Sequence, residues 1–586
     1  MMSLRNNSVS AVACLPIAIT AWALAAPEAT AAEPQRSEIL ITDMSRCTPA
    51  GKLVKGRQKG HWQLISYEGF EGKIRGTMMG SGSIADAPDV TLPLDLKGWY
   101  SVSIGLWNPV WAYDGDETVA KVKLTRDPCF AIVMDTGHTG YQGTELAEHF
   151  WCHADLTGQD IIFGQRDTKK SYVAYVRLVP LSEARVAAIR KDRARTDTRV
   201  VIASNDGNSF VVKGGISTKA DVWSEVELYR HSDVQRVTWA VNSGERADYQ
   251  SKVGRRYTAG GLPITPSEKK KVDAFKRLIA NNIDRVHEAC EHTHRIGRKF
   301  DAQFRLGILG GTPPGPYGVG FVADHPELRI IARDGTPIQK ASYAFPAVRQ
   351  FMLDFVREAA TKFDVDGVTL NFIRGPDFVG WEQPVLDDFR KAHGGDARKL
   401  TNDDERLQRV RARYLTLLVR GARAVLNEVG ERKGKRLELS VMTYGTFPGN
   451  LFHGMDVRTW LKEGLLDAVL GAGSMLHEVK AHDCRIYIGV GAREQANYVH
   501  QWKHHHTIAD GYWVWDMNFP QERSEHWAIL SRMGHADEMA TFDEKLPGAT
   551  TGTTRLRNVG GFEVYNIANQ GKNKSSPEFL FLFTGG

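Results

Sequence analysis

The segment Ser342–Pro376, SYAFPAVRQFMLDFVREAATKFDVDGVTLNFIRGP, decides the fold. Apolar residues recur every four positions from Ala347 to Ala359, a spacing that predicts an amphipathic helix. After a short polar turn, the run Val368–Phe372 alternates too little for a strand with one face in water. Such a run is typical of a parallel strand that is covered on both faces. The segment therefore predicts one helix–strand unit of an α/β fold.

Strands of this kind recur along 197–540 with helical patterns between them, the longest over Ser267–Arg298 and Glu405–Val429. The predicted strands are Arg199–Ser204, Val234–Val241, Gln303–Leu309, Val368–Phe372, Leu437–Met442, Ala468–Leu470, Cys484–Val490 and Gly511–Trp515. Eight alternating units predict a (β/α)₈ TIM barrel. A doubly wound open sheet is the alternative, but it needs a glycine-rich phosphate turn after an early strand. The glycines at Gly489 and Gly491 follow the seventh strand and do not make that motif.

The regions on either side of the barrel have β patterns. Short β-like runs broken by Gly, Asp and Pro predict a β-sandwich-like domain over 33–182. This domain could bind carbohydrate through Trp107, Trp111 or Trp151; the alternative is that these tryptophans are buried in the sandwich core. Residues 541–586 predict a C-terminal β extension, with two strand-like runs that would join either the barrel or the sandwich.

The N-terminus has the sequence pattern of an export signal. Arg5 precedes the apolar stretch Val9–Ala26, and Ala29 and Ala31 offer the small side chains of a cleavage site. Residues 1–32 therefore predict a signal peptide and a secreted or periplasmic protein, with an uncleaved N-terminal anchor as the alternative. No later segment approaches the roughly 20 apolar residues that span a bilayer.

Composition and motifs narrow the class of partner. The formal charge is +6, and no Lys/Arg-rich run alternates with aromatic residues, so we expect no nucleic-acid partner. Neither CxxC, HExxH nor a zinc-spaced Cys/His cluster occurs, so we expect neither a metal nor a cofactor. Cys129 and Cys152 could pair in an oxidising compartment, although their spacing does not require it.

Acidic, amide and aromatic residues gather at the predicted strand ends, where barrel enzymes place their chemistry. Glycoside hydrolysis needs two carboxyl groups flanking one bond. We predict Glu382 as the general acid, because Trp381 beside it could raise its pKa. Asp516 or Glu245 would be the nucleophile or base. The predicted substrate-binding residues are Asp206, Asn371, Arg374, Tyr444, Trp381, Trp515 and Asn518. Strand-end acids also cap helices and brace loops, which is the structural alternative for Asp206 and Glu245.

Several strings in order resemble one family. They are SNDGNSF (204–210), the run 227–254, HPELRIIARDGTPIQKASYAFPAVRQF (325–351), DGVTLNFIRGP (366–376) and WEQP (381–384). Together they resemble the glycoside-hydrolase-like (β/α)₈ barrel proteins, the family-10-type glycosyl hydrolase-like sequences of planctomycete-like bacteria. The resemblance covers about Arg199–His535 and implies a (β/α)₈ barrel with glycosidase activity.

One position departs from that resemblance. Related barrel hydrolases often carry an acid where this chain has Asn371, and an amide can serve neither as nucleophile nor as general acid. Three hypotheses follow: an exported glycoside hydrolase acting on a polysaccharide or oligosaccharide, a non-catalytic carbohydrate-binding protein on a glycosidase-like barrel, and a structural cell-envelope protein. The oligomeric state stays open.

Overall fold

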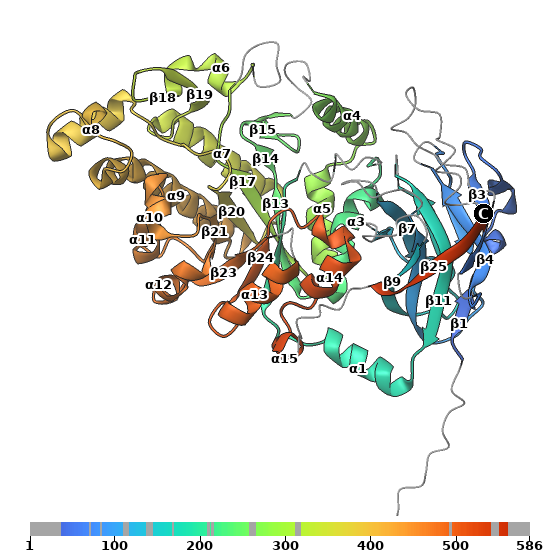
Figure 1. The fold of residues 1–586 in the computed structure, drawn as a ribbon. Coiled ribbons are helices and arrows are strands. Elements are labelled where there is room, and N and C mark those ends of the chain that lie inside the picture. Colours follow the sequence, from blue (N-terminus) through green and yellow to red (C-terminus); the bar gives the residue numbers. More distant parts are fainter. Residues whose placement is uncertain are drawn as a thin grey trace, which may run out of the picture. The chain divides into compact units, whose positions relative to one another are not determined.

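Eight parallel strands close into a barrel in the computed structural model (Figure 1). The structure describes residues 37–69, 72–82, 85–108, 117–135, 145–166, 169–207, 211, 216–256, 265–310, 318–491, 495–540 and 550–560. The predicted signal peptide, Trp111 and nearly all of the two predicted C-terminal strand runs lie outside these residues. The barrel strands are β12 (Val200–Asn205), β13 (Val234–Ala240), β17 (Lys299–Arg305), β20 (Gly367–Asn371), β21 (Glu438–Met442), β22 (Ala468–Gly471), β23 (Arg485–Val490) and β24 (Gly511–Val514).

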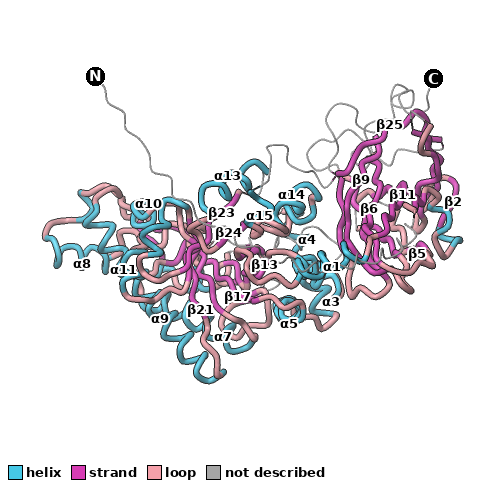
Figure 2. The backbone as a smooth tube through the Cα atoms, turned by 90° about the horizontal axis from the view of Figure 1, so that it is seen from below, coloured by secondary structure: helices cyan, strands magenta, loops and turns pink. Residues whose placement is uncertain are grey.

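Helices surround these strands, as the cyan tubes around the magenta strands show (Figure 2). They are α3 (Lys219–Glu227), α4 (Pro266–Ala280), α5 (Arg285–Arg295), α6 (Phe321–Asp324), α7 (Pro346–Lys362), α8 (Gln383–His393), α9 (Glu405–Lys433), α10 (Phe447–Phe452), α11 (Val457–Lys462), α12 (Leu476–Lys480), α13 (Gln495–His505), α14 (Ser524–Leu530) and α15 (Ala536–Ala540). The loops contain five further short strands: β14 (Asn242–Ser243), β15 (Arg246–Ala247), β16 (Arg255–Arg256), β18 (Arg329–Ile331) and β19 (Pro337–Ala341). The strand order β12 to β24 follows the chain, and β24 pairs with β12 to close the ring. The predicted (β/α)₈ TIM barrel is confirmed.

Side chains along each barrel strand alternate between the barrel interior and the helix layer. The outward residues, such as Phe304 and Val368, belong to one large apolar core shared with the helices. The interior has an apolar half built from six buried residues, which are Ile202, Met442, Ala468, Leu470, Tyr487 and Trp513. The predicted parallel strands covered on both faces are therefore present, and the covering side chains on the interior face are apolar for part of the ring.

The other half of the interior is polar. Ser204 and Thr238 both donate hydrogen bonds to Oε1 of Gln303, at 2.9 and 3.1 Å. Nearer the amino ends of the strands, buried Arg236 pairs with Asp301 and Glu438. These ionic and hydrogen-bonded side chains fill the interior of the lower barrel.

The N-terminal region is β-rich and contains two sheets that share an apolar cluster. The larger sheet contains β1 (Ile39–Ile41), β2 (Leu53–Lys55), β3 (Trp62–Gly69), β4 (Arg75–Ser81), β6 (Trp99–Trp107), β9 (Glu145–Asp155), β11 (Ser171–Pro180) and β25 (Thr550–Gly560). The smaller contains β5 (Val90–Leu92), β7 (Thr118–Leu124), β8 (Ala131–Asp135) and β10 (Ile161–Gln165). β25, from the C-terminal part of the chain, lies between β3 and β9, so that strand joins the N-terminal sheets and not the barrel. Helix α1 (Glu183–Arg193) follows β11.

The structure shows the surroundings of two of the candidate tryptophans and of all five described cysteines. Trp107 is buried and packs edge-on against Tyr172, which is a core position. Trp151 is half-buried against the cluster between the two sheets. The described cysteines, Cys129 and Cys152 among them, are free thiols, so the disulfide that we left open is not formed. Among the described residues, no helix combines the length and apolar character needed to cross a membrane.

Three predicted elements differ from the structure. The long helix predicted over Ser267–Arg298 is two helices, because Asn282 adopts a left-handed φ of 54° and Asp284 caps α5. The third strand begins at Lys299 and not at Gln303. Its first residues include charged side chains that do not fit the pattern of a buried strand, although Asp301 is buried and paired inside the barrel. Finally, the buried face of α7 runs through Val348, Met352, Phe355 and Ala359, one position away from the predicted Ala347 and Phe351.

Candidate functional site

The candidate site lies at the mouth of the barrel, where the carboxyl ends of the eight strands meet. Asp206 follows β12, Asn371 ends β20 and Trp515 follows β24, so the barrel brings these three predicted residues to one end. Arg305, which we did not predict, ends β17. The register aligns Arg305 with Asn371 on the neighbouring strand. Below, "the mouth" means Asp206, Arg305, Asn371, Arg374, Trp515 and Asp516.

One ion pair and one indole ring organise the mouth. Asp206 and Arg305 form an ion pair, and their side chains are 11% and 15% exposed. The guanidinium carbon of Arg305 lies 6.0 Å from the centre of the Trp515 ring, and that of Arg374 lies 5.4 Å from the same centre. Both distances are within cation–π range. Residues from β12, β17, the β20 loop and the β24 loop thus converge on one aromatic side chain.

Arg305 could have been found from the sequence. Asp301, Gln303 and Arg305 stand two residues apart, which is the spacing of one strand face. All three point into the barrel, as the contacts of Asp301 and Gln303 with other interior residues show. Because we began the strand at Gln303 and continued it to Leu309, Arg305 fell in its middle and not at its end.

Asn371 stands where the resemblance noted in the sequence leads us to expect an acid. It is fully buried, and neither the oxygen nor the nitrogen of its amide has a hydrogen-bond partner among the described residues. It shares the interior face of β20 with Thr369, whose hydroxyl approaches Asp301 at 3.5 Å. An unsatisfied buried amide costs free energy unless something completes its hydrogen bonds. Asn371 is therefore a buried amide at the base of the mouth whose hydrogen bonds a ligand could complete.

Glu382 is in a different environment from the one that the general-acid prediction requires. Its side chain is fully buried, and its two carboxylate oxygens each accept a hydrogen bond from the Gly380 N–H at 2.9 Å. One of them also accepts from the Ile331 N–H at 3.1 Å. Burial raises the pKa of Glu382, as we expected for an acid, but backbone amides lower it again in part. The carboxylate faces backbone N–H groups, so it joins the loop before α8 to β18.

Trp381 is also enclosed by protein. It is 9% exposed and is covered by the guanidinium of Arg411, whose carbon lies 3.9 Å from the ring centre. Arg411 also donates a hydrogen bond to the Gly380 carbonyl at 3.0 Å. The substrate-binding role of Trp381 and the catalytic role of Glu382 remain predictions to which this geometry gives no support.

Glu245 has a comparable structural role. It is 4% exposed, lies in the turn between β14 and β15, and accepts a hydrogen bond from the Phe321 N–H at the start of α6. Burial raises the pKa of Glu245, while that hydrogen bond lowers it. The hydrogen bond from Phe321 matches the structural alternative for Glu245, in which a strand-end acid caps a helix. The same bond engages the carboxylate that we predicted as a nucleophile or base.

Four predicted residues remain: Asp516 and Arg374, which belong to the mouth, and Asn518 and Tyr444. Asp516 directly follows Trp515, is half-buried and has a left-handed φ of 52°. Asn518 is fully buried. Tyr444 is half-buried, its ring lies 4.7 Å from that of His453, and burial raises the pKa of its hydroxyl. Arg374 is exposed. β12 and β24 are neighbours, with Ala203 opposite Val514, so Asp206 and Asp516 follow adjacent strands.

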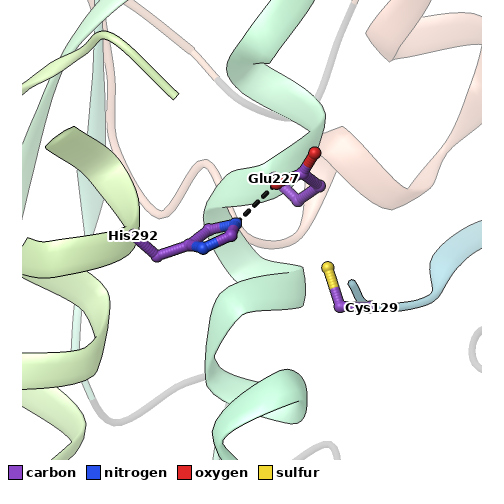
Figure 3. Close-up of side chains that lie close together, drawn as sticks. All are labelled: Cys129, Glu227 and His292. Carbon is purple, nitrogen blue, oxygen red and sulfur yellow. Dashed lines mark hydrogen bonds and ion pairs between the residues drawn. The ribbon is translucent and has the colours of Figure 1, made fainter. Parts of the chain in front are cut away.

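One group of potential metal ligands lies outside the mouth (Figure 3): Cys129, Glu227 and His292. Nε2 of His292 is 2.5 Å from the Glu227 carboxylate, while its Nδ1 accepts a hydrogen bond from Arg295 at 2.9 Å. Because Nδ1 accepts, the ring proton is on Nε2, the atom that would have to bind a metal. Metal-bound histidines show the opposite pattern, in which the second nitrogen donates. The cluster therefore has the chemistry of a buried hydrogen-bonded pair.

A second such group, Asp192, His535 and Glu538, is also occupied by protein contacts. Arg532 pairs with both carboxylates, and His535 bridges Asp192 and Asp233. A cation would have to displace that guanidinium. Neither group gives the metal-binding arrangement that a site of this kind requires.

Comparisons with known proteins give similarities of fold. No family model matches the chain, and no curated protein matches it. One solved structure that resembles it is the PgaB (BpsB) glycoside hydrolase domain from Bordetella bronchiseptica, with 12% identity over 58% of this chain and 99% of that one, at a TM-score of 0.41. Another is the α-L-fucosidase isoenzyme 2 from Paenibacillus thiaminolyticus, with 10% identity over 57% and 50% of the two chains, at a TM-score of 0.35.

A third is the β-galactosidase from the haloarchaeon Halorubrum lacusprofundi, with 10% identity over 59% of this chain and 58% of that one, at a TM-score of 0.39. The strand topology defines the class: this is a (β/α)₈ barrel protein with a β-rich N-terminal region.

Proposed function

We propose that this chain is an exported glycoside hydrolase that cleaves a polysaccharide or oligosaccharide at the barrel mouth. The observation that carries the proposal is the convergence of the Asp206–Arg305 ion pair and Arg374 on the half-buried indole of Trp515. Sugar sites combine an aromatic surface for C–H faces with a few fixed polar groups for hydroxyls. The mouth offers both at the end of the barrel that carries the chemistry in this fold.

The carboxyl pair that we now favour is Asp206 and Asp516. They follow adjacent strands, β12 and β24, and so start from neighbouring positions at the mouth. Hydrolysis needs two carboxyl groups about 5–10 Å apart. A salt-bridged carboxylate is an anion, as a nucleophile or base must be, so Asp206 takes that role and Asp516 that of the acid. Glu382 and Glu245 are less suited, because backbone N–H groups already hold their carboxylates.

Non-catalytic carbohydrate binding is the second candidate function, and a specific observation favours it. The strand-end position that often holds an acid in related barrels is Asn371, and the predicted general acid Glu382 is fully buried. A barrel that has kept its aromatic and polar mouth without a working carboxyl pair would hold a glycan and release no product. This candidate predicts binding that persists when both Asp206 and Asp516 become amides.

The test is an assay of reducing-end release and of binding on a panel of polysaccharides, with Asp206→Asn and Asp516→Asn beside the wild type. Hydrolysis predicts a loss of about 10²-fold or more in each variant, since each removes one of the two carboxyl groups. Asp403→Asn, at an exposed position on the loop before α9, is the matched control. Full activity in both variants would remove this pair from the mechanism. Binding without any release in the wild type would favour the second candidate.

Export is part of the proposal and rests on the sequence of residues 1–32. Expression of the full chain in a Gram-negative host, followed by N-terminal sequencing of the protein in each fraction, tests it. A mature chain beginning near Ala32 outside the cytoplasm would support export. A cytoplasmic protein with an intact N-terminus would contradict it.

A further inference from the structure

Arg374 differs from the other charged side chains of the mouth. It is exposed, and its guanidinium carbon lies 5.4 Å from the ring centre of Trp515. Among the described residues it forms an ion pair with no carboxylate, Asp516 included, and its guanidinium packs against the indole. A guanidinium held against an aromatic ring is oriented without losing its hydrogen-bond donors. Arg374 therefore presents five N–H donors at the mouth in a fixed position.

Arg305 provides the contrast within the same site. Its guanidinium also lies over Trp515, at 6.0 Å, but it pairs with Asp206 and its side chain is only 15% exposed. The charge of Arg305 is thus compensated inside the protein. The charge of Arg374 is not compensated by any described side chain, and it faces solvent. Of the two cations on one indole, only Arg374 is available to an incoming ligand.

The base of the mouth contains a polar group whose hydrogen bonds are not satisfied. Asn371, buried and aligned with Arg305, has an amide without a described hydrogen-bond partner. A ligand oxygen or a water held by a ligand would complete those hydrogen bonds. An oriented guanidinium close to a buried amide is an arrangement that recognises a planar or tetrahedral oxyanion.

We propose that the mouth selects a glycan with an anionic substituent, which Arg374 holds by paired hydrogen bonds. The substituent is the carboxylate of a uronic acid or a sulfate ester, which share the paired oxygens that a guanidinium binds. This inference rests on the proposed carbohydrate function and adds the class of sugar. Trp515 orients Arg374, and Asp206 keeps Arg305 from competing for the same anion.

The experiment compares matched glycans on the full chain by isothermal titration calorimetry. The probes are an oligogalacturonide and its methyl ester, and a sulfated galactan oligosaccharide and its desulfated form. The proteins are the wild type, Arg374→Gln and Arg374→Lys. Arg413→Gln, at an exposed arginine of α9 that lies 3.7 Å from Asp388, controls for loss of one surface charge. Thermal unfolding of each variant shows that the fold is kept.

The wild type should bind one charged probe about tenfold or more tightly than its neutral partner, the value of one charge-assisted hydrogen-bonded pair. Arg374→Gln should reduce that ratio to about one, and Arg374→Lys should retain part of it, since lysine keeps the charge without the fork. Which pair shows the effect identifies the carboxylate or the sulfate. Equal affinity of the wild type for charged and neutral forms overturns this inference and leaves the carbohydrate function standing. Failure to bind any of the four probes or any glycan of the panel overturns both.

Discussion

The carboxylate of Glu382 accepts a hydrogen bond from the Ile331 N–H at 3.1 Å, across 51 residues of sequence. The same side chain accepts two more from Gly380 and is fully buried. Sequence alone placed this residue at the mouth as a general acid. Its contacts make it a brace between the loop before α8 and β18, and that role can be separated from catalysis by experiment.

Replacing Glu382 by Ala should lower the free energy of unfolding by about 2–3 kcal/mol, because buried N–H groups lose their acceptor. Glu382→Gln keeps one oxygen acceptor and should cost about half as much. Urea denaturation followed by circular dichroism measures both. A Glu382→Gln variant that is as stable as the wild type but releases no reducing ends would contradict the brace and restore the general acid.

Breaking a buried ion pair at the amino end of the barrel should lower the free energy of unfolding more than breaking an exposed one. Arg236→Met leaves the buried carboxylate of Asp301 without its guanidinium, and we expect a loss of about 3–5 kcal/mol in unfolding free energy. Arg458→Met, which breaks an exposed pair with Glu478, should cost about 0–1 kcal/mol. Guanidinium chloride titrations of the two variants compare them. Equal losses would show that burial of the Arg236 pair is unimportant.

His294 should give the stability a measurable pH dependence. Its Nε2 lies 2.9 Å from the Asp366 carboxylate, which raises the pKa of His294; Asp364 also faces the ring, and Lys435 opposes the shift. A raised pKa in the folded state means that the contribution is complete below the unfolded pKa of about 6.5 and disappears as the pH rises through the folded value.

His294→Gln should therefore destabilise the protein by about 0.5–1 kcal/mol at about pH 5.5 and by much less at about pH 8.5. His287→Gln, at an exposed position of the same helix α5, is the control and should leave the pH profile unchanged. Unfolding free energies at several pH values provide the measurement. A loss that is larger at the alkaline end would contradict the sign of this linkage.

The Cys129, Glu227 and His292 group should take up no structural metal, since the Nε2 that a metal needs carries the proton donated to Glu227. Adding one equivalent of zinc, or EDTA, should leave the thermal midpoint of the purified protein unchanged. A zinc-dependent rise that vanishes in Cys129→Ser would show that the hydrogen-bonded arrangement yields to a metal.

The barrel could be predicted because its signal is local. Every residue of β20 is buried, as expected for a strand covered on both faces, and β20 begins within one residue of the prediction. The third strand was displaced by four residues, because the ionic partner of Asp301, Arg236, comes from a strand 65 residues earlier in the sequence. Similarly, the break at Asn282 depends on one left-handed residue that helical periodicity does not reveal. Asp366 directly precedes β20 and accepts hydrogen bonds from the Phe300 N–H and from His294, so it lies at the amino ends of the strands, away from the mouth.

The site was harder to predict than the fold. Strand-end position correctly brought Asp206, Asn371 and Trp515 to one mouth. It could not distinguish an acid that faces the mouth from one that faces backbone N–H groups, as Glu382 and Glu245 do. That difference depends on the path of the loops near Ile331 and Phe321, which sequence spacing does not specify. Arg305 was missed for the related reason that its strand was assigned the wrong end.

The most direct test of the central claim is the affinity of Trp515→Ala for a glycan that the wild type binds, measured by calorimetry beside Trp515→Phe. If the mouth is the carbohydrate site, the alanine variant should bind at least about tenfold more weakly, and phenylalanine should recover part of the loss, because the aromatic surface that orients Arg374 contributes on the order of 1–2 kcal/mol. An alanine variant that keeps its fold and its full affinity would place the glycan elsewhere and contradict the account.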